Sequence, residues 1–219
     1  MTSSNVALGT AEDKRVAQLA TITILGVIYF FVAVGGLHFL RPEIDPVKNV
    51  ASYYAVGPNG FLMTAAFFAF GLSLVTLAVG LYQGVILSAR SRPGLILLGV
   101  AGVGLVLSGI FPTDITPDNS PSTAVGGIHI LSGVVAFLCL IVAALLWSRR
   151  FRQDNRWKSF ESTSWGFATA GLVAFIVFFI IIAAQLPIGG LGERILIPLM
   201  LLWMLLTAIR LRSIASGSA

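Results

Sequence analysis

Residues 121–147 read PSTAVGGIHILSGVVAFLCLIVAALLW, a stretch of 27 residues without a single Asp, Glu, Lys or Arg. At 1.5 Å per residue, a helix of that length is about 40 Å long, which exceeds the ~30 Å hydrocarbon core of a bilayer. Three arginines follow within the next five residues. The pattern predicts a membrane-spanning helix that ends at a basic loop.

Five further apolar runs repeat this pattern along the chain. They cover residues 16–40, 61–88, 94–111, 163–186 and 194–210. None shows the alternating pattern of a membrane barrel strand. The whole chain of 219 residues is 57% hydrophobic and 11% charged, whereas soluble domains carry about 25% charged residues. We therefore predict an all-α, polytopic membrane protein with six transmembrane helices.

The expected domain organisation is simple. Residues 1–15 are expected to be a mobile cytoplasmic N-terminus, residues 16–212 a single six-helix transmembrane domain, and residues 213–219 a cytoplasmic tail. In the third helix, Gly99, Gly102 and Gly109 form one small-residue stripe, and Gly104 and Ser108 form a second. Small residues let membrane helices approach closely, so this helix is expected to sit centrally, with neighbours on two sides.

Basic residues are distributed unevenly between the two ends of the predicted bundle. If the loops alternate between two sides, eleven of the fourteen Lys and Arg residues lie with the termini, and only Arg41, Lys48 and Arg194 lie opposite. This asymmetry predicts cytoplasmic termini (N-in/C-in) in the cell (inner) membrane. The net charge of +5 then reflects topology and attraction to anionic membrane lipids, not a nucleic-acid partner. Trp147, Trp157 and Trp165 surround the most basic loop, which predicts an interfacial aromatic belt.

Three ionisable residues are expected at the end of the bundle opposite the termini. His38 lies near the end of the first helix, Asp114 just after the third, and His129 near the start of the fourth, which we expect to have Ser120 as its N-cap and Pro121 as its first residue. Ionisable groups at membrane depth usually face a bundle interior or a water-filled cavity and indicate a functional site. We expect these residues to line one polar pocket.

Three interpretations of these residues remain open. They can be polar contacts between helices, with each histidine donating to a carbonyl or to Asp114. His38, Asp114 and His129 can instead bind a divalent metal, since imidazole and carboxylate are ordinary ligands of zinc and iron. His38 and His129 can also be the two axial ligands of a haem. No HExxH motif supports a metal, so no cofactor is predicted.

Glu193 and Arg194 begin the last helix on the same side as the two histidines. A glutamate at a helix N-terminus is favoured by the helix dipole, and an arginine there can bind a phosphate or carboxylate through two hydrogen bonds. We therefore include both residues in the candidate pocket.

Several segments resemble the domain-of-unknown-function 998 family, whose members are prokaryotic six-helix membrane proteins. The resemblance rests on the motifs at His38, Arg41-Pro42, Asp45-Pro46, Ser52-Tyr53-Tyr54 and Gly57, on Gly109-Ile110-Phe111-Pro112-Thr113-Asp114, on His129, and on Gly192-Glu193-Arg194. It covers nearly the whole chain, and Phe-Pro-Thr-Asp with the downstream histidine is its most specific part. It implies the six-helix fold and supports the five pocket residues, but it implies no activity.

The sequence thus predicts an integral membrane protein with a polar pocket on the extracytoplasmic side. The pocket is expected to bind a lipid-like small molecule, or the protein is a subunit of a membrane complex or a homo-oligomer. The alternatives are a membrane-embedded enzyme that acts on a lipid by metal-dependent or acid–base chemistry, and a bis-His haem protein. Whether the protein is an enzyme is left open.

Overall fold

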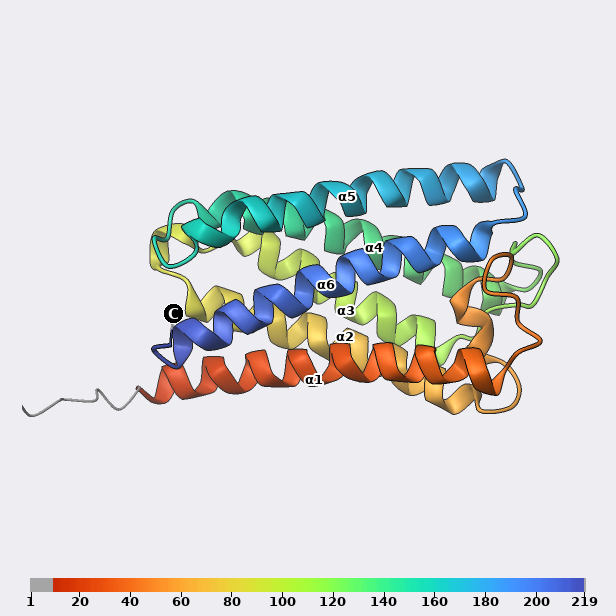
Figure 1. Ribbon diagram of the computed structural model, residues 1–219, viewed down its shortest axis with the longest axis horizontal. Helices are drawn as coiled ribbons and strands as arrows, with labels where there is room; N and C mark the ends of the chain where they lie inside the picture. Colours follow the sequence, from red (N-terminus) through yellow and green to blue (C-terminus); the bar gives the residue numbers. More distant parts are fainter. Residues whose placement is uncertain (1–9, 219) are drawn as a thin grey trace, which may run out of the picture.

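The computed structural model describes residues 10–218, and this part of the chain is all-helical (Figure 1). The elements are α1 (Ala11–Leu40), η1 (Ala51–Ala55), α2 (Gly60–Gly84), η2 (Leu87–Ala89), α3 (Arg92–Ile110), α4 (Ala124–Phe151), α5 (Lys158–Ala183) and α6 (Gly189–Ala215). The six α-helices are each long and apolar enough to cross a membrane. The predicted six-helix membrane fold is confirmed.

The helices alternate in direction and form a closed ring. Each helix packs against its neighbours in sequence, and α6 closes the ring by packing against α1, with further contacts to α2 and α4. Both ends of the described chain lie at one end of the bundle (Figure 1), which we call the terminal end. The connections 41–59, 111–123 and 184–188 lie at the other end, which we call the distal end.

Several helix boundaries differ from those expected. Helix α1 begins at Ala11 because Thr10 and Asp13 form a reciprocal capping box, so residues 11–15 are helical; the expected mobility of residues 1–9 falls outside the described chain. Helix α4 begins at Ala124, with Thr123 and not Ser120 as its N-cap. Helix α6 runs through Ala215 and so includes part of the expected tail.

The two small-residue faces of α3 pack against different helices, as predicted. A Cβ atom on Gly102 would lie 2.8 Å from the Gly71 carbonyl oxygen of α2, and one on Gly104 would lie 2.8 Å from the Ser132 carbonyl oxygen of α4. The expected central position is wrong, however, because α3 is one member of the ring. Gly99 has no atom within 4 Å of its Cβ position.

The prediction of an interfacial aromatic belt is also wrong for two of its three tryptophans. Trp147 and Trp157 are fully buried, and the Trp157 ring stacks on Phe151 with ring centres 4.2 Å apart. Only Trp165 is half-exposed. An apolar position that faces another helix looks the same in sequence as one that faces lipid, so these residues belong to the core near the terminal end.

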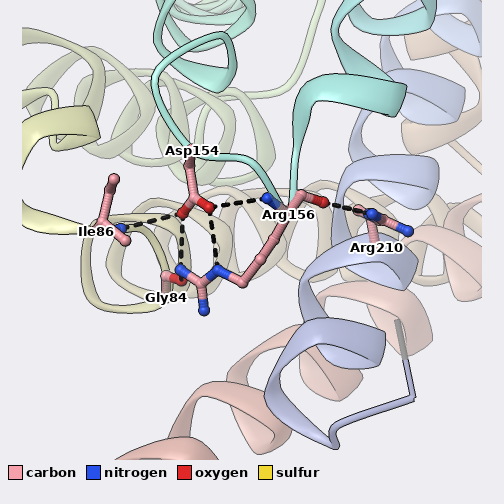
Figure 2. Close-up of polar contacts among 5 residues, drawn as sticks. All are labelled: Gly84, Ile86, Asp154, Arg156 and Arg210. Carbon is pink, nitrogen blue, oxygen red and sulfur yellow. Dashed lines mark hydrogen bonds and ion pairs between the residues drawn. The ribbon is translucent and has the colours of Figure 1, made fainter.

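At the terminal end, Asp154 and Arg156 join two connections and the last helix into one clasp (Figure 2). Its carboxylate accepts hydrogen bonds from Arg156, with the closest N–O distance 2.7 Å, and from the backbone N–H of Ile86 at 3.2 Å. Arg156 also donates to the Gly84 carbonyl, and its own carbonyl accepts from Arg210 of α6. The clasp fixes the α2–α3 and α4–α5 connections against the end of the last helix.

Candidate functional site

The distal end is closed by a distal cap, formed by residues 41–59 and 111–123. The Tyr53 hydroxyl donates to the Thr116 carbonyl at 2.6 Å and accepts from the Thr116 N–H at 3.0 Å. Asn119 bridges the same two segments, because its side chain accepts from the Val50 N–H and donates to the Lys48 carbonyl. These bonds hold two loops far apart in sequence as one layer over the helix ends.

Beneath the distal cap, the structure contains a cavity of about 140 Å³, the distal cavity, between α4, α5 and α6. Its apolar wall includes four phenylalanines, Phe137, Phe175, Phe178 and Phe179. Its polar residues are Ser52, Thr113, Asn119, His129 and Glu193. The lining is therefore aromatic on the helix side and polar beneath the cap.

A smaller cavity of about 50 Å³, the inner cavity, extends toward α1, α2 and α3. Ser52, His129, Gly133, Phe137 and Glu193 line both cavities. The wall between the cavities therefore contains one carboxyl group and one imidazole.

Glu193 is attached to the distal cap by one of its two oxygens. Its Oε2 accepts a hydrogen bond from the backbone N–H of Ala51, the first residue of η1. Its Oε1 has no hydrogen-bond partner among residues 10–218. Because Glu193 lines both cavities, Oε1 is the oxygen available to a molecule bound there.

His129 has one nitrogen engaged and one free. Its Nδ1 lies 2.9 Å from both the Ser108 and the Phe111 carbonyl oxygens. Carbonyl oxygens only accept hydrogen bonds, so we assign the ring proton to Nδ1. No protein group in the described chain bonds to Nε2, which therefore presents a lone pair at the cavity wall.

His38 and Arg194 pair with each other, and neither lines the two cavities. The Arg194 Nε donates to His38 Nε2 at 3.0 Å, while His38 Nδ1 lies 2.6 Å from the Val34 carbonyl oxygen. Arg194 also donates to the Asn49 carbonyl at 2.6 Å and lies over the Tyr54 ring. This pair joins α1, α6 and the distal cap.

Asp114 lies at the N-terminus of α4 and does not line either cavity. Its carboxylate accepts from the backbone N–H groups of Ser122 and Thr123 at 2.8 and 2.7 Å, and from the Thr123 hydroxyl. The hydrogen bonds from Thr123 and Ser122 hold the pKa of Asp114 below its ordinary value. The five predicted residues are thus divided among the cavities, the His38–Arg194 pair and the start of α4.

A sequence profile of the family described as Protein of unknown function (DUF998) matches residues 24–210. The chain belongs to this family. The match includes both cavities and all five predicted pocket residues. No curated protein and no solved structure matches the chain.

In this DUF998 protein, the described residues contain no group of three or more His, Cys, Asp or Glu side chains that could hold a metal ion. Both nitrogens of His38 are engaged, so His38 would have to release Arg194 before it could bind a haem iron or any other metal. His129 Nε2 needs no such release.

Several lining residues were not identified from the sequence. Ser52 and Thr113 belong to motifs on which the family resemblance rests, but neither was placed in the pocket. Asn119 lies in a loop of ordinary polar composition, and the phenylalanines of α5 belong to the apolar run FIVFFI. Asn119 adopts a φ of 57°, in the left-handed region where asparagine is enriched, but only the structure reveals this angle. The remaining residues lack a local pattern that would separate cavity wall from lipid-facing surface.

Proposed function

We propose that this protein binds a lipid-like amphiphile, with the polar group of the ligand in the distal cavity near Glu193 and His129. The observation that carries the proposal is the combination of four phenylalanine rings with an unpartnered carboxyl oxygen and an unpartnered imidazole nitrogen in one cavity. Ligand sites in proteins are mostly apolar, with a few polar groups that orient the ligand.

The size of the cavity limits which part of an amphiphile enters it. A cavity of about 140 Å³ resembles an engineered cavity of about 150 Å³ that binds benzene, and is smaller than the roughly 300–1,000 Å³ of pockets that bury drug-sized ligands. Phe179 lines the cavity and is also 40% exposed on the outer surface of the bundle. The head group would therefore occupy the cavity, and the chain would lie against α5 among the membrane lipids.

The proposed location is the cell (inner) membrane of a prokaryote, with both termini in the cytoplasm. The positive-inside rule supports this orientation, because eleven of the fourteen basic residues lie at the terminal end. The distal cavity would then open on the extracytoplasmic side.

The proposal can be tested by filling the cavity. Gly133 lines both cavities, and the nearest atom to its Cβ position is the Ser108 hydroxyl oxygen at 3.8 Å. A Gly133→Leu side chain would occupy the space of the ligand. The probe is an eight-carbon alcohol with a photoreactive diazirine beside the hydroxyl, and mass spectrometry locates its crosslinks. We expect crosslinks within 129–137 and 175–182 in the wild type, and at least a fivefold loss in Gly133→Leu.

Gly127→Leu is the matched control, because Gly127 lies on the same helix, lines neither cavity and has no atom within 4 Å of its Cβ position. It should retain wild-type crosslinking. Equal crosslinking of the Gly133→Leu and Gly127→Leu variants, or no crosslink within these two segments in the wild type, would overturn the proposal.

A further inference from the structure

We infer that the distal cavity selects a cationic head group, an organic ammonium at the end of an apolar chain. This inference rests on the proposed amphiphile binding and names the chemical class of the ligand.

The first argument is charge. Among residues 10–218, Glu193 is the only Asp or Glu that lines either cavity, and no Lys or Arg lines them. The adjacent Arg194 donates to His38, Asn49 and Gly190 through Nε and Nη1, while its Nη2 is buried without a partner in the described chain, and Arg194 lines neither cavity. A phosphate or carboxylate head group would meet one acidic side chain in the cavity and no basic one. An ammonium would meet an opposite charge.

The second argument is hydrogen-bond polarity. The polar side-chain atoms without a partner in the described chain at the wall shared by the two cavities are Glu193 Oε1, His129 Nε2 and the Ser52 hydroxyl. With the ring proton on Nδ1, His129 Nε2 only accepts hydrogen bonds, as does the carboxylate of Glu193, whereas the Ser52 hydroxyl both accepts and donates. One of the two N–H donors of the Asn119 amide is engaged with the Lys48 carbonyl. A primary ammonium has three N–H donors and no acceptor, so it matches this set. A head group that only accepts hydrogen bonds would meet these two acceptors and a single free donor at the shared wall, the Ser52 hydroxyl, so it matches less well.

The third argument is the aromatic wall. Phe137, Phe175, Phe178 and Phe179 line the distal cavity, and the faces of aromatic rings attract organic cations. A carboxylate removed from water is costly unless it is paired. A cation between Glu193 and the rings offsets that cost, and the rings favour an ammonium over a small hydrated metal ion.

The test compares three head groups on one chain. In dodecyl maltoside micelles at neutral pH, octylammonium, octanol and octanoate compete with the photoreactive alcohol for crosslinking to residues 129–137 and 175–182. In the wild type, octylammonium should displace the probe at a concentration about tenfold lower than octanol, the range of a charge-assisted hydrogen bond. Octanoate should be the weakest competitor.

Glu193→Gln should remove the preference, so that octylammonium and octanol displace the probe at similar concentrations. The amide oxygen can still accept from the Ala51 N–H, so the link to the distal cap is kept. Asp118→Asn is the charge-matched control, because Asp118 is an exposed acidic residue of the distal cap that lines neither cavity. It should retain the tenfold preference.

The outcomes separate this inference from the proposed function. Equal displacement by all three competitors in the wild type overturns the inference and leaves the amphiphile site standing. The same holds if Asp118→Asn abolishes the preference as fully as Glu193→Gln, because the preference is then a general effect of charge. If the probe fails to crosslink in the wild type, the proposed function fails and the inference fails with it. If the Glu193→Gln variant does not fold, the comparison of the three competitors in the wild type still tests whether the cavity prefers an ammonium.

Discussion

At the scale of single residues, the buried charges of this protein hold separate segments together through backbone groups. Arg41 donates to the carbonyls of Val56 and Pro58, Arg194 donates to the Asn49 carbonyl, and Asp154 accepts from the Ile86 N–H. Each pairs a backbone group with a charged side chain, and a hydrogen bond to a charged group contributes about 1.5–3 kcal/mol. Most of these charges therefore stabilise loops, and Glu193 is the one with an oxygen left free at a cavity.

The Asp154 clasp yields a stability prediction. Asp154 is 2% exposed, so Asp154→Ala leaves the Ile86 N–H and the Arg156 guanidinium without their acceptor. We expect a loss of about 2–3 kcal/mol in the free energy of unfolding, measured by denaturation in detergent micelles. Glu161→Ala is the control, because it removes the more exposed ion pair with Arg152 at the same end and should cost less than about 1 kcal/mol. Equal losses would refute the role of the clasp.

The same residue gives a pH dependence. Burial alone would raise the pKa of Asp154, but hydrogen bonds from Arg156 and Ile86 outweigh burial and hold the pKa below its ordinary value of 3.8. A carboxyl with a lowered folded-state pKa contributes stability that is complete above its unfolded pKa and is lost as the pH falls through the folded value. The difference in stability between the wild type and Asp154→Ala should therefore be constant above about pH 5 and shrink below 3.8.

At the scale of elements, the start of α4 is defined by three residues. Thr123 is the N-cap and accepts from the Gly126 N–H, while Asp114 accepts from the Thr123 N–H and hydroxyl. Negative charge at a helix N-terminus is favourable. His129 lies five residues into α4, so this cap positions the imidazole at the cavity wall.

Two adjacent glycines at this helix start should respond differently to the same substitution. A Cβ on Gly126 would lie 2.1 Å from Asp114 Oδ2, whereas a Cβ on Gly127 would have no atom within 4 Å. Gly126→Ala must displace the Asp114 carboxylate and should cost about 1–2 kcal/mol, the size of a lost cap. Gly127→Ala should stabilise by up to about 1 kcal/mol. Thermal unfolding of the two variants in one detergent checks the difference, and a common shift for both would contradict the role of Asp114.

At the scale of the whole molecule, the two ends of the ring have different chemistry. The terminal end carries most of the basic residues and the Asp154 clasp, whereas the distal end carries the cap and the cavities. Inner-leaflet anionic lipids attract basic segments by about 1 kcal/mol per residue. This asymmetry is the observation on which the proposed orientation rests, in which the cavity lies away from the cytoplasm.

Cysteine labelling tests this orientation. Cys139 is the only cysteine, so a Cys139→Ala background allows one new thiol at a time. In intact cells, a membrane-impermeant maleimide should label the Asp118→Cys variant and leave the Ser88→Cys variant unlabelled. Both positions are exposed, and labelling of both after permeabilisation is the control. The reverse pattern would place the termini outside.

Much of the architecture could be predicted from the sequence because the length and hydropathy of a segment are local properties. The lengths of the apolar runs predicted the six spans, and the spacing of small residues predicted the two packing faces of α3. The scarcity of ionisable groups singled out His129 and Glu193. The resemblance to the DUF998 family pointed to the same residues.

The grouping of the site residues depended on tertiary structure. His38 pairs with Arg194, Asp114 caps α4, and Trp147 and Trp157 enter the core, because packing decides which face of each helix meets a neighbour. In a soluble protein, a polar outer face would reveal that choice in the sequence. Here lipid-facing and core-facing positions are equally apolar. The sequence by itself therefore determined the helices and the uneven charge of their two ends, and the packing of the ring decided which two of the five predicted residues share a cavity.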